Sequence, residues 1–175
     1  CIRDSNKTIL GSMKKALKGK AEVLYAKGSN LMYDAKREAD ATMFGREMRD
    51  SRSNEEMLKE ALNVAQQADI IVAAVGESSE MSGECSSRTN LEMPDAQKDL
   101  LIALKKTGKP IVLVNFSGRA TVMTWEQENF PAILNVWFGG CESGDAICDV
   151  LFGDKVPSGK LTATMPKSVG QIPLY

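Results

Sequence analysis

The sequence predicts an α/β fold, specifically a three-layer α/β/α sandwich around one mostly parallel sheet. Two short runs rich in Ile and Val, at 70–75 and 111–114, have no polar residue that could face solvent. This pattern is typical of strands buried on both faces of a parallel sheet. Helical patterns separate these runs, and strand–helix–strand repetition indicates right-handed βαβ units in one sheet covered on both faces.

Helical spacing of apolar residues predicts five helices. Gly19 is the expected C-cap after the helix at Lys7–Leu17, and Gly108 is expected to end the helix at Asp95–Thr107. Ser53 with Glu56 forms a capping box, in which Ser53 is the N-cap of the second helix. In chain order the helices are expected at Lys7–Leu17, Ser53–Gln67, Asp95–Thr107, Thr121–Glu128 and Ser143–Phe152.

Short runs of strand-forming residues predict four parallel strands and a short fifth strand at an edge. The polar stretch Asn30–Arg52 shows neither the helical nor the strand spacing of apolar residues, and we expect an irregular excursion there. The strands are expected at Glu22–Ala26, Ile70–Val75, Ile111–Val114, Ala132–Trp137 and Lys160–Thr164.

A long connection after the strand at 70–75 is the best candidate for a functional site. It has no helical or strand periodicity and carries three carboxylates, Glu77, Glu80 and Glu84, with one cation, Arg88. In open α/β sheets ligands bind outside the carboxyl ends of the strands, and loops this long are uncommon unless they are functional or disordered. The sequence therefore places the candidate site in this loop.

Composition excludes several classes of function. The chain has 175 residues, a net charge of −1 and 26% charged residues, so nothing favours a nucleic-acid or membrane-surface partner. No apolar run approaches the roughly 18 residues that span a bilayer. The absence of histidine excludes Ser-His-Asp and Cys-His nucleophiles and histidine-ligated zinc. The four cysteines have no CxxC spacing, and we expect no metal and no cofactor.

Five motifs in order resemble the C-terminal α/β sandwich domain of family 3 glycoside hydrolases, which has a flavodoxin-like sheet. Within this family, the chain is most similar to the periplasmic β-glucosidase/β-xylosidase type. The similarity covers most of the chain and is strongest from Asp69 onward. The motifs are the segment 68–114, Asn115–Arg119, Ala132–Trp137, Phe138–Gly144, and Asp149–Asp154 with Pro157–Leu161.

The resemblance implies that residues 1–175 are one domain of a longer retaining β-glycosidase that hydrolyses O-glycosidic bonds. In that family the nucleophilic aspartate lies on a preceding barrel domain, and a barrel needs about 250 residues. We therefore expect a fragment that lacks the N-terminal barrel domain and a fibronectin-like domain, and that is inactive alone. The expected partners are that barrel and a β-linked oligosaccharide or a β-glucoside or xyloside. A periplasmic or secreted location is implied by the resemblance only.

The resemblance also assigns the general acid/base to a glutamate on the long loop, which matches Glu84, with Glu80 as its rival. At 85–88 this chain has Cys-Ser-Ser-Arg where many members have Gly, an aromatic residue, Asp and Arg. We expect Glu84 to be exposed in the isolated domain. Arg88 and Glu77 are weaker candidates for substrate binding, and both also fit a structural role. The alternative function is a stand-alone α/β module that binds carbohydrate or a partner without catalysis.

Overall fold

A computed structural model describes residues 7–41 and 49–174. The chain divides into two compact units. The first unit comprises Cys1–Leu24 with Phe138–Thr162, and the second comprises Tyr25–Trp137 with Ala163–Tyr175. Each unit is described separately below.

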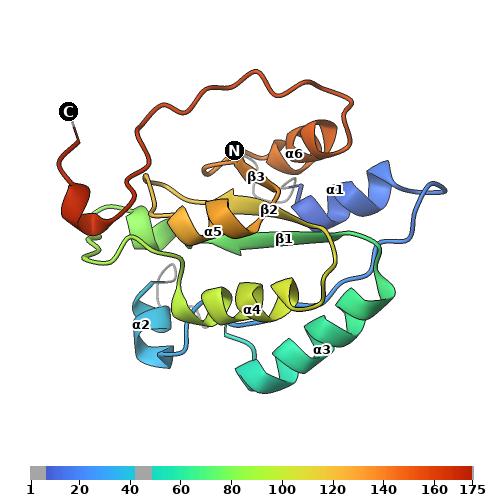
Figure 1. Ribbon diagram of the computed structural model, residues 1–175, viewed down its shortest axis with the longest axis horizontal. Coiled ribbons are helices and arrows are strands. Elements are labelled where there is room, and N and C mark those ends of the chain that lie inside the picture. The colour runs from blue at the N-terminus through green and yellow to red at the C-terminus, as the bar shows by residue number, and fades with distance from the viewer. Residues whose placement is uncertain (1–6, 42–48, 175) are drawn as a thin grey trace. The chain divides into compact units, whose positions relative to one another are not determined.

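The second unit contains the parallel sheet, as predicted (Figure 1). Its strands are β1 (Ile71–Gly76), β2 (Ile111–Phe116) and β3 (Ala132–Asn135), in the order β1-β2-β3. Ile71 pairs with Ile111 and Val112 pairs with Ala132, so both ladders are parallel. The strands predicted at 70–75, 111–114 and 132–137 are confirmed as strands of one parallel sheet. Only β2 is buried over most of its length, whereas Ala74 of β1 and Ala132 of β3 are exposed. Strand β3 also ends before the expected Trp137, where φ is +52°.

Helices α3 (Asn54–Gln67) and α4 (Asp95–Lys105) pack beside the sheet and against each other. Figure 1 shows both along the same side of the strands. The predicted capping box of α3 is present, since Glu56 N donates to Ser53 Oγ and Ser53 N donates to Glu56 Oε2. The buried apolar core lies between these helices and the strands and includes Leu101 and Leu113, both fully buried.

The remaining elements of this unit are short: α2 (Ala35–Asp40), the 3-10 helices η3 (Ser79–Ser82) and η4 (Val169–Gln171), and α5 (Thr124–Asn129). The stretch predicted as an irregular excursion therefore contains a helix, α2, which begins at its N-cap Asp34. Part of that stretch, 42–48, lies outside the described residues. Helix α5 begins later than the predicted Thr121.

The first unit is a pair of helices, α1 (Ile9–Ala16) and α6 (Ser143–Leu151), packed against each other. Gly144 makes the close approach possible, because a Cβ there would lie 2.5 Å from Lys7 O. Asp145 joins the helices through polar contacts, since it accepts from Lys7 Nζ at 2.8 Å and from Ser12 Oγ at 2.6 Å. Ser12 is buried in this contact.

Two predicted strands are wrong. Within the part of the chain that the structure describes, neither Glu22–Ala26 nor Lys160–Thr164 pairs with another strand. Every residue of Lys160–Thr164 is exposed, and Tyr25 is 58% exposed. Residues that favour strands stabilise a sheet only when their backbone is paired and one face is covered. Among the helices of the described residues, none is long and apolar enough to cross a membrane.

Candidate functional site

The candidate site begins where β1 ends, at a glycine that no other residue could replace without strain. Gly76 has a φ of +135°, and a Cβ there would lie 1.9 Å from Phe116 O. The next residue, Glu77, donates its backbone N–H to the same carbonyl at 2.8 Å. Only glycine permits this close approach of the ends of β1 and β2. The chain therefore leaves the sheet with Glu77 directly beside β2.

Gln97 of α4 fixes the end of β1 from the opposite side. Its Oε1 accepts from Gly76 N at 2.8 Å, and its Nε2 donates to Gly76 O at 2.8 Å and to Leu31 O at 3.2 Å. Since β1 is an outer strand of the described sheet, Gly76 has no neighbouring strand on this side. The buried amide of Gln97 satisfies the two backbone groups instead.

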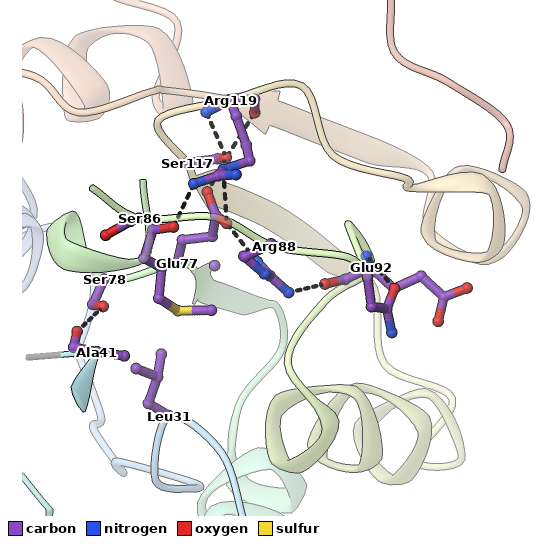
Figure 2. A network of polar contacts seen from close by, with 12 residues as sticks. Leu31, Ala41, Glu77, Ser78, Ser86, Arg88, Glu92, Ser117 and Arg119 are labelled. Carbon is purple, nitrogen blue, oxygen red and sulfur yellow. Dashed lines mark hydrogen bonds and ion pairs between the residues drawn. The ribbon is translucent and has the colours of Figure 1, made fainter. Parts of the chain in front are cut away.

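A buried carboxylate, Glu77, is the centre of a polar network at this end of the sheet (Figure 2). Its side chain is 2% exposed and forms ion pairs with Arg88, through NH1 to Oε1, and with Arg119, whose Nε lies 3.5 Å from Oε1. Its other oxygen accepts from Ser117 Oγ at 2.8 Å. Buried charges need such partners because water cannot solvate them. The two guanidinium groups and the hydroxyl are therefore the partners that hold the buried carboxylate of Glu77 in place.

The same two arginines bind carbonyl groups of the long loop. Arg119 NH2 donates to Met81 O, and Arg88 NH2 donates to Glu92 O at 2.9 Å (Figure 2). Met81 lies in η3 near the start of the loop, whereas Glu92 lies just before α4. Through its arginines, Glu77 is thus connected to both parts of the loop.

Glu84 lies at the corner of an exposed turn in this loop. Ser86 N donates to Gly83 O at 3.2 Å, which closes a four-residue turn with Glu84 and Cys85 at its centre. Cys85 has a φ of +60°, the conformation that type II turns require at their third position and that favours glycine. Glu84 is exposed, as predicted.

Glu80, the rival candidate, is half-buried in η3 and accepts a hydrogen bond from Ser79 Oγ at 3.2 Å. The Ser86 hydroxyl donates to the backbone carbonyl of Glu80 and so connects the turn to η3. Both candidate glutamates are therefore held in one local structure. Of the two, Glu84 has the more accessible carboxylate.

Sequence reasoning placed four polar residues in this loop and missed three that hold it. The structure brings Glu77 and Arg88 into direct contact, whereas Glu84 and Glu80 lie on the turn and η3. Ser117, Arg119 and Gln97 were not singled out, although the first two lie in the motif Asn115–Arg119. The signal was available in principle: a serine and an arginine directly after a buried parallel strand lie at the same sheet edge as the loop.

A small cavity of about 10 Å³ lies beside this network. Such a volume holds about one water molecule and is far too small for a sugar ring. Within 7–41 and 49–174, no three His, Cys, Asp or Glu side chains are grouped so that they could hold a metal ion. The cavity is lined by Gly76, Glu77, Glu92, Met93, Pro94, Asn115, Thr121 and Met123.

Comparison with known sequences gives relatives over almost the whole chain. A "Periplasmic beta-glucosidase" from Salmonella typhimurium is 46% identical over 99% of this chain and 23% of its own length. A "Beta-xylosidase" from Formosa agariphila is 36% identical over 95% of this chain and 20% of its own length. The chain therefore spans only about a quarter or less of these relatives.

Solved structures of similar fold agree with the sequence relatives. A beta-glucosidase from Listeria innocua, crystallised in complex with gluconolactone, matches 98% of this chain and 21% of its own, with 28% identity and a TM-score of 0.78. A beta-glucosidase from Kluyveromyces marxianus in complex with glucose matches 70% of this chain and 15% of its own, with 34% identity and a TM-score of 0.66. The Glycosyl hydrolase family 3 C-terminal domain profile matches residues 3–175, so the chain belongs to this family.

Proposed function

We propose that this chain is the C-terminal domain of a longer retaining β-glycosidase of the β-glucosidase/β-xylosidase type, and that Glu84 is its general acid/base. The observation that carries the proposal is the exposed carboxylate of Glu84 on a turn at the carboxyl end of the sheet. The loop that bears it is held by a buried ion-pair network, as a catalytic loop requires. The names of the relatives, a beta-glucosidase and a beta-xylosidase, support the substrate class.

Two carboxylates about 5–5.5 Å apart perform retaining hydrolysis. In our proposal the nucleophile lies on an N-terminal barrel domain of the longer chain, and docking of that barrel brings it close to Glu84. Glu84 protonates the oxygen of the leaving group in the first step and then, as a carboxylate, activates the water that releases the sugar.

The substrate, a β-linked oligosaccharide or a β-glucoside or xyloside, binds mainly on the barrel in this proposal. The cavity beside Glu77 is consistent with that division, because its volume of about 10 Å³ excludes a sugar ring. We expect the purified 175-residue chain to have no hydrolytic activity on aryl β-glucosides, and the full-length protein to be active. Turnover by the chain alone would contradict the two-domain mechanism. Sugar binding by a full-length protein without glycosidase activity would favour the alternative of a binding module.

Glu84→Ala in the full-length protein tests the acid/base assignment. General acid catalysis contributes about 10²–10⁴-fold, so hydrolysis of an unactivated disaccharide falls by that order. An aryl glycoside with a good leaving group needs little proton donation and keeps its first step. Added azide restores part of its turnover, since a small anion attacks without a general base.

Glu128→Ala is the matched control, because Glu128 is an exposed glutamate on α5 outside the loop. Its activity on both substrates is expected to equal that of the unchanged enzyme. Full activity of Glu84→Ala on the disaccharide rules out the assignment and makes Glu80→Ala the next variant to measure.

Two finer points belong to the same proposal. Contact with substrate by Glu77 or Arg88 stays a prediction, and their mutual ion pair favours a role in holding the loop. We infer a periplasmic or secreted location because the Salmonella relative is named as periplasmic. Fractionation of cells that produce the full-length protein tests the location.

A further inference from the structure

Arg119 reaches the candidate loop from a different part of the chain, because it follows β2 whereas the loop follows β1. Its guanidinium lies between Glu77 and the carbonyl of Met81. Its backbone N–H donates to Ser117 Oγ at 3.1 Å, so the start of its side chain is also held. A planar guanidinium has its N–H groups in a fixed fork, and orientation toward Glu77 therefore fixes the direction of the bond to Met81.

Met81 transmits this constraint to the turn that bears Glu84. It lies in η3, just before the turn, and its side chain is buried. The Ser86 hydroxyl then connects the end of the turn to Glu80 O, which also belongs to η3. The turn is thus attached to η3 at both of its ends, and η3 is attached to Arg119.

We propose that Arg119 is a positioning residue: its guanidinium holds η3 and thereby sets the direction in which the turn presents Glu84. This inference rests on the proposed function and adds a determinant from outside the loop. Arg119 contacts no substrate in this role. Arg88 differs, because its carbonyl partner is Glu92 at the far end of the loop, next to α4.

The test compares Arg119→Met and Arg119→Lys in the full-length enzyme. Methionine removes every donor at similar side-chain length. Lysine keeps the charge beside Glu77, but one ammonium group lacks the fork that joins Glu77 to Met81 O. Arg52→Met is the matched control, since Arg52 is a half-exposed arginine whose ion pairs with Asp50 and Glu60 lie outside the loop.

Misplacement of a catalytic group by about 1 Å costs up to about 100-fold, so we expect Arg119→Met to lower kcat/KM on an unactivated disaccharide about 10- to 100-fold. On an activated aryl glycoside the loss of kcat/KM is expected to stay below about threefold, because kcat/KM reports the first step and that step needs little proton donation there. The activity of Arg119→Lys is expected to lie between that of Arg119→Met and that of the unchanged enzyme. Arg52→Met is expected to equal the unchanged enzyme on both substrates.

Equal losses of kcat/KM on both substrates, or no loss on either, would overturn the inference. If Arg119→Met does not yield folded enzyme, Arg119→Lys decides by the same comparison. Glu84→Ala, measured in parallel, distinguishes failure of the acid/base assignment of Glu84 from failure of the positioning role of Arg119. Should Glu84→Ala show no dependence on the leaving group, the acid/base assignment and the positioning role both fail. If the loss of activity depends on the leaving group in Glu84→Ala but not in the Arg119 variants, only the positioning role fails.

Hydrogen exchange gives a readout independent of activity. In the full-length Arg119→Met variant we expect amides of 81–86 to exchange faster than in the unchanged enzyme, while amides of α3 keep their rates. Arg52→Met is expected to leave the amides of 81–86 unchanged. Unaltered exchange at 81–86 in Arg119→Met would show that Arg119 does not hold η3, and would overturn the inference.

Discussion

Replacement of Glu77 by glutamine is expected to destabilise the 175-residue chain by about 3 kcal/mol. Glutamine has nearly the same shape and keeps an oxygen for the Ser117 hydroxyl, so the change isolates the loss of charge. Removing one partner of a buried ion pair costs about 3–5 kcal/mol. We take the lower end, because the side chains of Arg88 and Arg119 are 15% and 23% exposed and water still reaches them.

Urea unfolding, followed by the fluorescence of Trp125, measures this effect. With an m-value of about 2 kcal/mol/M, a loss of about 3 kcal/mol lowers the midpoint by about 1.5 M. Glu60→Gln is the control, because Glu60 and its partner Arg52 are both 43% exposed and such a pair contributes about 1 kcal/mol at most. A midpoint shift for Glu77→Gln no larger than that for Glu60→Gln would refute the role assigned to the buried charge.

Three further outcomes can be measured on the same chain. Gly144→Ala is expected to destabilise it by about 1–3 kcal/mol in urea unfolding, because the new Cβ would lie 2.5 Å from Lys7 O; an unchanged midpoint would contradict the close helix contact. The hydrogen bond from Lys7 lowers the pKa of Asp145 to about 2. The contribution of Asp145 to the free energy of unfolding is therefore fully present above the pKa that an aspartate has in the unfolded chain, about 3.9, and is lost as the pH falls toward 2. Urea midpoints across that range should therefore fall less for Asp145→Asn than for the unchanged chain. The hydrogen bond to Asp99 raises the pKa of Tyr33 to about 12. The contribution of Tyr33 to the free energy of unfolding is therefore fully present below about pH 10 and is lost as the pH rises toward 12. An absorbance titration of tyrosinate should lose its latest step in Tyr33→Phe, and a retained step would contradict the assignment.

Local signals in the sequence predicted the core of the fold well. The runs around Ile71 and Ile111 became β1 and β2, since short apolar runs rich in Ile and Val are typical of strands in a parallel sheet. The capping box at Ser53 fixed the start of α3 because both of its hydrogen bonds lie within four residues of chain. The wrong strands, Glu22–Ala26 and Lys160–Thr164, show the limit of such signals. Strand propensity says nothing about whether a neighbouring strand is available to pair.

The candidate site was predicted in part. The loop and its carboxylates followed from composition and from the position after an apolar strand, and the exposure of Glu84 followed from the family resemblance. The partners of Glu77 did not, because Ser117 and Arg119 approach it only through the pairing of β1 with β2. A carboxylate in a polar loop gives no local sign that it will be buried. That burial results from tertiary structure and needs coordinates to be seen.

The pairing of β1 with β2 also determines when this site can form during folding. The bond between Ser117 and Glu77 joins residues 40 positions apart, and the register of Ile71 with Ile111 spans the same separation. Contacts this distant in sequence form slowly, because the entropy of closing the intervening chain is lost before any contact compensates for it. During synthesis Glu77 leaves the ribosome well before Ser117 and Arg119, so the complete network cannot form until both have followed. The network that holds the candidate catalytic loop therefore forms no earlier than the β1–β2 ladder itself.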